Sequence, residues 1–314
     1  MHYKRFAAAL LFTVPALAAA QSSVTIYGVA DAAIASEDNG PSRNTVINSG
    51  NQSSSRIGFR GTEDLGYGLK ALFNIEAGVA IDTGAGDPAG LFQRRAVVGV
   101  QHAYGTLTIG REYSPIASIA AATDILGQGF YGSNLSSFGT NPAFPRLTRR
   151  LANSVNIKST PWRGFALLAA YSAAPGGNEP VSPAPSNNLK GVAVEYANGP
   201  FYFGGGFHVL KRLPTGDDKE YALGAGFTFN QFDIKANGLI ADQEGPDNRF
   251  QQYNLGASMT MGPNKFFLNG QHNKLPGIKG NSFAIAYSYN LSKRTNLYAS
   301  YAKIWNDNSA FFGI

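Results

Sequence analysis

The sequence predicts an all-β protein, a transmembrane up-and-down antiparallel β-barrel. Apolar and polar residues alternate with a period of two in about fifteen successive runs between Val24 and Lys303. The segments that join these runs are alternately short and long. Such barrels show this alternation because tight turns gather at one end and longer loops at the other. No segment after residue 20 has the about 18 consecutive apolar residues that a spanning helix requires.

Residues 1–20 are typical of a secretory signal peptide. Lys4 and Arg5 precede an almost wholly apolar stretch, and Ala18-Ala19-Ala20 matches a small-residue cleavage site. We therefore expect the mature chain to form one barrel over residues 21–314. The formal net charge is only +6 before the signal peptide is removed, which does not favour a nucleic-acid partner. The chain contains no cysteine and thus does not depend on disulfides.

The strand-like runs predict one face in lipid and one face in water. In the run from Asn281, large apolar side chains (Phe283, Ile285, Tyr287 and Tyr289) alternate with small ones (Ser282, Ala284, Ala286 and Ser288). Backbone groups that cross lipid must all be paired, so such a sheet has to close on itself. A closed sheet of fifteen or more strands leaves an aqueous channel rather than a filled core.

Aromatic residues recur beside the short turns. Tight turns at one end of a membrane barrel lie near the lipid–water interface, where aromatic girdles form. We therefore expect one such girdle at Tyr67, Tyr104, Trp162, Phe201, Phe232, Tyr289 and Tyr298.

The period of two also predicts which cations face the channel. If the apolar residues of each run face lipid, then their neighbours face the lumen, and these neighbours are Arg56, Arg60, Lys70, Arg95 and Arg150. An arginine on the lipid face near the midplane costs about 2–4 kcal/mol, which favours the lumenal placement. Arg94 falls on the opposite phase, although a bulge or the end of its strand could redirect its side chain. These residues predict a basic wall on the second to sixth strands.

The segment Glu112–Arg149 is the longest connection. It contains few charges and many Gly, Ser, Ala and Phe residues, which favours a packed loop over a disordered one. We expect this loop to fold into the lumen and narrow it. Glu112 or Asp124 would then lie opposite the basic wall, and opposed charges across a constriction would create a transverse field.

Catalytic signals are weak. The four histidines (His2, His102, His208 and His272) do not form a metal-ligand pair on one element, and the sequence has no G-x-S-x-G. We therefore predict neither an enzyme nor a bound cofactor or metal.

Several stretches together resemble the Gram-negative trimeric general porins of the beta-proteobacterial (Neisseria, Burkholderia and Comamonas-like) type. The most specific are SSSRIGFRGTEDLGYGLKALFNIEAG, RRAVVGV, RLANSVNIKSTPWRGF and LSKRTNLYASYAK. The resemblance implies a sixteen-stranded homotrimeric barrel in the outer membrane, a third loop folded inward, and wall arginines at Arg56, Arg94 and Arg150. It thereby supports the lumenal placement of Arg94.

The sequence departs from this pattern in two ways. The acidic residue before a Phe-Gly-Gly turn, frequent in the family's constriction loop, has no counterpart here. The family also ends in a strand that closes on an aromatic residue, whereas this chain stops at AFFGI. The sixteenth strand is thus absent from the predicted strands: either the sequence is truncated, which we expect, or another segment closes the barrel.

The function predicted from these features is passive diffusion of small hydrophilic solutes and ions through an outer-membrane general porin that leans towards anions. One alternative is a channel that prefers organic acids or phosphate. Another is an outer-membrane structural or interaction protein whose loops are the working part. Small lumenal side chains such as Ser282 and Ala286 favour a pore over the structural alternative.

Overall fold

The computed structural model describes residues 23–38, 40–88, 90–134, 148–177, 188–212, 216–245 and 248–307. Fifteen strands in this part of the chain form one sheet in which every strand pairs antiparallel with its neighbours. These strands are β1 (Ser23–Val29), β4 (Arg56–Gly66), β5 (Leu69–Gly78), β6 (Arg95–His102), β7 (Gly105–Tyr113), β8 (Arg150–Ser159), β9 (Phe165–Ser172), β10 (Leu189–Asn198), β11 (Phe201–Arg212), β12 (Gly216–Phe229), β13 (Phe232–Asp242), β14 (Arg249–Met261), β15 (Asn264–Leu275), β16 (Ile278–Asn290) and β17 (Asn296–Asn306). After β1 the strand order is simply the chain order, the up-and-down topology expected from the alternating connections.

The first predicted strand is split in two. β1 ends at Val29, and the chain continues as β2 (Ala32–Asp38), which pairs only with β3 (Arg43–Ser49) in a separate two-stranded sheet. The break is held by Asp31, whose buried carboxylate accepts backbone hydrogen bonds from Gln52 (2.8 Å) and Ser53 (2.7 Å). β3 does not correspond to any of the strand-like runs in the sequence, so this hairpin is an addition to the predicted strands.

The two faces of the large sheet match the predicted alternation. In β16, Phe283 and Ile285 are 40% and 46% exposed on the outer face, whereas Ala284 is 1% exposed on the inner face. Leu151 in β8 is an exception, because it is fully buried with Leu189 and Leu210 instead of facing lipid. Asn153, at φ +49°, interrupts the extended backbone two residues later and shifts the alternation of this strand.

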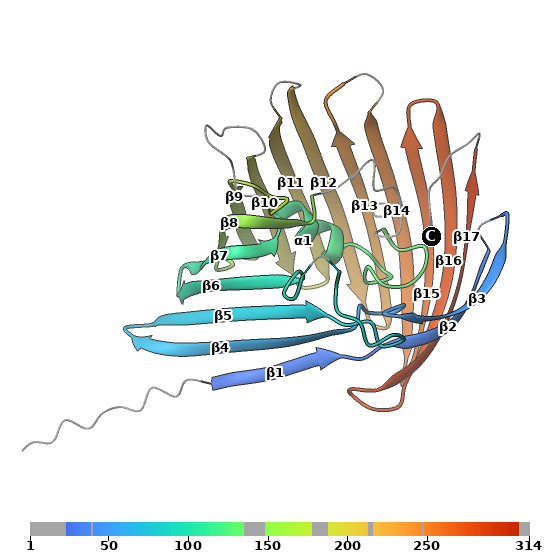
Figure 1. The fold of residues 1–314 in the computed structure, drawn as a ribbon, viewed down its shortest axis with the longest axis horizontal. Coiled ribbons are helices and arrows are strands. Elements are labelled where there is room, and N and C mark those ends of the chain that lie inside the picture. The colour runs from blue at the N-terminus through green and yellow to red at the C-terminus, as the bar shows by residue number, and fades with distance from the viewer. Residues whose placement is uncertain are drawn as a thin grey trace, which may run out of the picture.

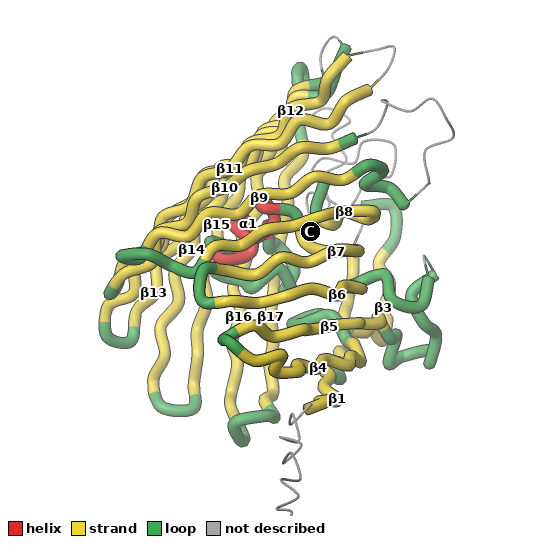
Figure 2. The backbone as a smooth tube through the Cα atoms, turned by 90° about the vertical axis from the view of Figure 1, so that its left-hand side faces the viewer, coloured by secondary structure: helices red, strands yellow, loops and turns green. Residues whose placement is uncertain are grey.

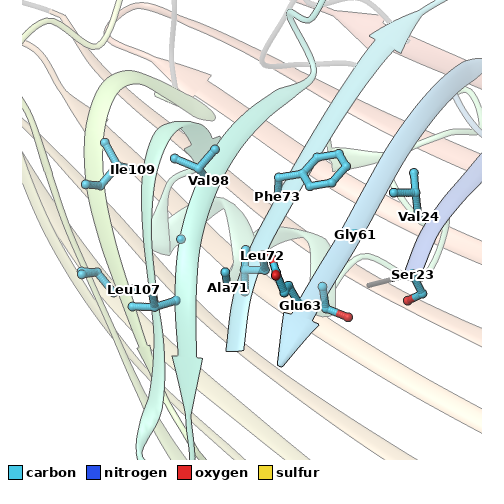
Figure 3. Close-up of a pocket in the computed structure, with 13 residues that line it drawn as sticks. Ser23, Val24, Gly61, Glu63, Ala71, Leu72, Phe73, Val98, Leu107 and Ile109 are labelled. Atoms are coloured by element: carbon cyan, nitrogen blue, oxygen red, sulfur yellow. The ribbon is translucent and has the colours of Figure 1, made fainter. Parts of the chain in front are cut away.

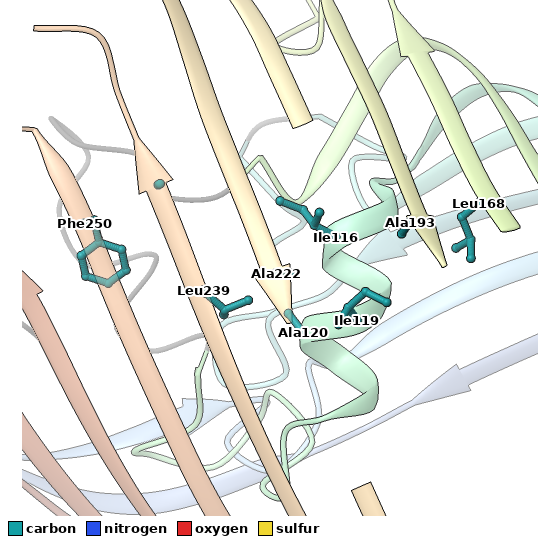
Figure 4. Close-up of a cluster of buried hydrophobic side chains, with 9 residues drawn as sticks. Ile116, Ile119, Ala120, Leu168, Ala193, Ala222, Leu239 and Phe250 are labelled. Atoms are coloured by element: carbon teal, nitrogen blue, oxygen red, sulfur yellow. The ribbon is translucent and has the colours of Figure 1, made fainter. Parts of the chain in front are cut away.

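A short helix, α1 (Pro115–Ala122), lies inside the curve of the sheet (Figures 1 and 2). Ser114 caps it, since its Oγ accepts a hydrogen bond from Ala117 N at 3.3 Å, and Pro115 occupies the first turn, where no N–H is needed. Ile116, Ile119 and Ala120 pack against inner-face residues of the sheet (Figure 4), namely Leu168, Ala193, Ala222, Leu239, Ala241 and Phe250. The described residues contain no helix with both the length and the apolar character needed to cross a bilayer.

Glycines on the inner face let the loop approach the strands closely. A Cβ at Gly204 would lie 2.5 Å from Ile119, one at Gly224 would lie 2.6 Å from Thr123, and one at Gly256 would lie 2.2 Å from Ile125. These distances are shorter than van der Waals contact. The glycines therefore form a shallow depression in the inner face, called here the glycine seat, into which α1 and the residues that follow it fit.

The two ends of the strand order lie near each other. Among the described strands, β1 and β17 stand at opposite ends of the order. Tyr298 on β17 nevertheless donates a hydrogen bond to Asp31, at the end of β1. The sheet therefore curls round until its last strand reaches the break in its first.

Candidate pore constriction

Arg56, Arg94 and Glu76 form the first part of a basic cluster on the inner face of β4, β5 and β6. Glu76 Oε1 lies 2.6 Å from Arg94 Nε, and its Oε2 lies 3.7 Å from Arg56 Nε. The Tyr27 hydroxyl is 3.0 Å from the same carboxylate. One carboxylate thus serves two guanidinium groups, so this part of the cluster keeps a net positive charge.

Arg94 reaches the lumen because it precedes β6 rather than belonging to it. Its backbone N–H donates to Glu76 O at 3.3 Å, which holds the residue beside the start of β6 at Arg95. Because Arg94 lies outside the strand, its side chain does not follow the strand's alternation and turns towards Glu76. This geometry agrees with the redirected position that the sequence resemblance implies for Arg94.

Arg95 and Glu112 form a separate ion pair across β6 and β7. Arg95 Nε donates to Glu112 Oε2 at 3.0 Å. Glu112 therefore lies on the same side of the lumen as the arginines, next to them on the adjacent strand. The expectation that Glu112 faces the basic wall across the channel is corrected, because the side chain reaches sideways to Arg95.

Arg149 and Arg150 gather around Tyr113 at the start of β8. Their guanidinium carbons lie 5.6 and 4.8 Å from the centre of the Tyr113 ring, and Arg150 donates to the Tyr113 hydroxyl at 3.0 Å. No described carboxylate forms an ion pair with either residue. Burial and the charge of Arg150 lower the pKa of Arg149 to about 10, so Arg149 remains cationic at neutral pH.

Arg111 also belongs to this cluster, and the sequence analysis did not identify it. Simple alternation along β7 would place it with Leu107 and Ile109 on the outer face. The pairing of β7 with β6 continues without a shift through Arg111, whose partner is Ala96, so Arg111 keeps this phase. The irregularity between β7 and β8 has its extra residue on β8, near Asn153. Arg111 Nε donates to Gln93 O at 2.6 Å, and its charge interacts with that of Arg150.

The arginine cluster consists of Arg56, Arg94, Arg95, Arg111, Arg149 and Arg150, and two other predicted cations lie outside it. Arg60 shares the inner face of β4 with Arg56 but contacts Tyr27 instead, 5.3 Å from its ring centre. Lys70 is exposed beside the short turn after β4. It lies eight residues along β5 from Gly78, the partner of Arg56, or roughly 26 Å at about 3.3 Å per residue.

Asp124 does not face the lumen. It is 1% exposed, and its carboxylate accepts backbone hydrogen bonds from Leu126 (3.0 Å), Gln128 (3.1 Å) and Asn134 (3.0 Å). Burial raises the pKa of Asp124 to about 6 despite these bonds. The expectation that Asp124 opposes the basic wall is therefore corrected, since the carboxylate organises the turn that follows α1.

The described part of the loop instead presents an uncharged edge. Ala121 and Gly127 are its exposed residues. Gln128 extends from this edge to the arginine cluster and accepts a hydrogen bond from Arg149 at 3.0 Å. Between Tyr113 and Thr148 the sequence contains no acid other than Asp124. The loop therefore offers no exposed carboxylate to the arginines.

The loop follows the inner wall away from the arginine cluster. Side-chain amides on three strands donate to its backbone carbonyls: Asn237 to Thr123 (2.9 Å), Gln252 to Asn134 (3.1 Å) and Asn269 to Gly132 (2.9 Å). Phe130 then meets the ring of Tyr298 on β17, with the centroids 5.5 Å apart. The loop thus lines β9 to β17, whereas the arginine cluster occupies β4 to β8 and the segments that flank these strands.

A separate hollow of about 480 Å³ lies on the outer face of β1 and β4 to β7. Phe73, Val98 and Ile109 line it (Figure 3), and they alternate with the lumenal residues of their strands. It therefore belongs to the membrane-facing surface. Within the described residues, no group of His, Cys, Asp and Glu side chains could hold a metal ion.

A Gram-negative porin family model matches residues 7–309 of the chain. The chain belongs to the Gram-negative porin family. This porin is 30% identical to outer membrane porin protein 32 of Delftia acidovorans, over 95% of this chain and 88% of that protein. It is also 30% identical to an outer membrane porin protein of Bordetella pertussis, over 95% of this chain and 93% of that one.

A solved structure agrees with this membership. The anion-selective porin from Comamonas acidovorans has a TM-score of 0.82 and 26% identity to this porin, covering 93% of this chain and 92% of that one. The predicted fold class, a transmembrane up-and-down antiparallel β-barrel, is confirmed. The porin is an outer-membrane diffusion channel and not an enzyme, as predicted.

Proposed function

We propose that this porin prefers anions among the small hydrophilic solutes that it admits, and that the loop Glu112–Arg149 forms one side of its constriction. The observation that carries the proposal is the burial of Asp124. With this carboxylate turned into the loop, the arginine cluster has an uncharged loop edge as its neighbour in the lumen.

The charges within the arginine cluster support the same preference. Glu76 and Glu112 offset part of the charge of the cluster, and Asp87 lies near enough to Arg111 for their opposite charges to attract. Arg149 and Arg150 have no such partner among the described residues. Low-dielectric walls concentrate the field of such charges in a narrow channel, which raises the local concentration of anions. The anion-selective Comamonas porin, similar over nearly the whole chain, is consistent with this proposal.

Carboxylates or phosphates are a second, narrower candidate class of solute. Neither Arg149 nor Arg150 forms an ion pair with a described carboxylate. Guanidinium groups bind carboxylate and phosphate oxygens through paired N–H groups, which a halide cannot reproduce. A solute of this class should therefore reduce the chloride current more than a neutral sugar of equal size.

We further propose that residues 1–20 are removed on export and that the mature porin assembles as a homotrimer. The outer face supports assembly in lipid, because it exposes many large apolar side chains, among them Val24, Val98 and Leu223. A heat-modifiable band of trimer size in cold SDS-PAGE would test the assembly. A band of monomer size in cross-linked membranes would contradict it.

The main experiment replaces Arg56, Arg94 and Arg150 together with Gln. If these arginines set the preference, then the reversal potential across a KCl gradient shifts towards cations. An unchanged reversal potential in a folded variant would refute the role of the cluster.

A further inference from the structure

His208 and Glu220 form a buried pair on the inner wall, outside the arginine cluster. They are direct cross-strand partners on β11 and β12, and they are 0% and 6% exposed. His208 Nδ1 lies 3.2 Å from Glu220 Oε2. Neither residue contacts the uncharged edge of the loop or the arginines.

The pair binds both ends of the loop. At the start of α1, Ile116 N donates to His208 Nε2 at 3.3 Å. At the other end, Thr148 donates to Glu220 Oε1 through both its backbone N and its Oγ1, each at 2.8 Å. The two ends also bind each other, since Ser114 N donates to Arg149 O at 3.0 Å.

These contacts define the proton positions in the pair. Because Nε2 accepts from Ile116, the proton of a neutral imidazole lies on Nδ1 and is donated to Glu220. Glu220 Oε1 then accepts both bonds from Thr148, and Oε2 accepts the one from His208. Neither partner has an equivalent replacement, because removing one leaves the other buried and unsatisfied.

The surrounding wall is shaped around the imidazole. A Cβ at Gly191, the partner of His208 on β10, would lie 2.4 Å from His208 Cδ2. Apolar contacts already hold α1 against the wall. The polar pair adds directional hydrogen bonds that fix the two ends of the loop. Thr148 directly precedes Arg149 and Arg150, so its bond to Glu220 also holds the backbone from which these arginines project.

We infer that His208 and Glu220 are positioning residues for the constriction: they clamp both ends of the loop and thereby set the channel width and the placement of Arg149 and Arg150. The inference rests on the proposed role of the loop as one side of the constriction. It does not require the channel to prefer anions.

Two amide substitutions of His208 separate its two contacts. In His208→Gln the amide lies near the former position of Nε2 and can accept from Ile116. In His208→Asn the amide lies near the former position of Nδ1 and can reach only Glu220. The clamp predicts that His208→Gln stays closer to the wild type in conductance and noise than His208→Asn, which should give a noisier, wider channel. Glu220→Gln, which weakens the Thr148 side, should resemble His208→Asn.

Hydrogen exchange of the loop amides provides a second readout in the full-length folded porin. Loss of one buried hydrogen bond should speed exchange in residues 115–134 by about 5- to 30-fold. The double variant His208→Asn with Glu220→Gln should be no worse than the more damaging single variant, because both break one unit.

Three results would overturn the clamp. The first is wild-type conductance, noise and exchange in folded His208→Asn and Glu220→Gln. The second is equal damage from His208→Gln and His208→Asn, which would indicate packing alone. The third is full additivity in the double variant. If the unmodified porin lacks anion preference, the proposed selectivity fails, but these conductance and exchange readouts still decide the clamp.

Discussion

At the scale of single residues, the arginines of the cluster differ in how much charge they leave uncompensated. Arg95 is paired with Glu112, and Arg56 and Arg94 share Glu76. Arg149 and Arg150 have only Tyr113 and Gln128 as described side-chain partners. Equal formal charges should therefore contribute unequally to selectivity.

We predict that Arg150→Gln shifts the reversal potential more than the double variant Arg95→Gln with Glu112→Gln does. Replacing Arg95 alone also leaves the carboxylate of Glu112 without its partner, so Glu112 is replaced as well to keep the net charge constant. In Arg95→Gln with Glu112→Gln the charge change is zero, and the reversal potential should stay near that of the wild type. Equal shifts in Arg150→Gln and this paired variant would contradict the ranking.

Asp124 makes the seating of the loop depend on pH. Burial raises its pKa from the ordinary value of 3.8 to about 6. An acid with a raised pKa stabilises the seated loop fully below its ordinary pKa, and this contribution is lost as the pH rises through the raised value. Lowering the pH from about 7 to about 5 should therefore strengthen the seating.

Protection of residues 115–134 in hydrogen exchange, corrected for the intrinsic rate at each pH, measures this effect. Protection should increase on acidification in the wild type. Asp124→Asn should remove most of the pH dependence of this protection, because the Asn amide stays neutral at both pH values. If acidification instead lowers the protection of the wild-type loop, then the predicted effect of Asp124 is contradicted.

At the scale of elements, the loop packs against inner-face glycines of the strands, where the absence of side chains leaves room for it. We predict that Gly256→Ala displaces the loop, because the new Cβ would lie 2.2 Å from Ile125 and 2.6 Å from Asn269 Oδ1. Overpacking of this kind costs about 1–3 kcal/mol. The displaced loop should give a higher and less steady single-channel conductance.

Gly270→Ala on β15 is the matched control, since its Cβ would meet nothing closer than 4.0 Å. It should leave the conductance unchanged. If both glycine variants conduct like the wild type, then the close contact at Gly256 does not position the loop.

Deleting part of Ser114–Pro145 tests the loop as a whole. If it narrows the lumen, the shortened porin should conduct more and admit larger sugars in a liposome-swelling assay. An unchanged size limit would mean that the loop does not form the constriction.

The sequence predicted the strands well because alternation is repeated in every strand of the sheet. It failed where one residue breaks the period. The irregularity at Asn153, where φ is +49°, and the break at Asp31 each move side chains to another face or strand. A slip of one residue inverts a strand, which explains the misplacement of Leu151.

The site was harder to predict than the fold because it depends on contacts between distant segments. Arg56 and Arg95 followed from strand phase, whereas the contacts of Arg150 depended on Tyr113 and those of Glu112 and Asp124 on Arg95 and on a turn after α1. His208 and Glu220 lie twelve residues apart on paired strands. Nothing near them in the sequence indicates that both ends of the loop meet there.

At the scale of the whole molecule, α1 lies inside the curve of one sheet (Figures 1 and 2), and the loop and the arginine cluster lie along different strands of that sheet. The loop lines β9 to β17 and buries its acid, while the arginines gather on β4 to β8. The expected transverse field between opposed charges is thereby replaced by a field of one sign. This arrangement is the physical basis of the proposed anion preference.

The reversal potential of the unmodified porin across a KCl gradient tests this claim most directly. We predict an anion-selective sign that weakens as the mean salt concentration rises, because the screening length falls from about 30 Å at 0.01 M to about 3 Å at 1 M. A cation-selective sign, or a preference that does not change with salt, would contradict a field of one sign from the arginine cluster.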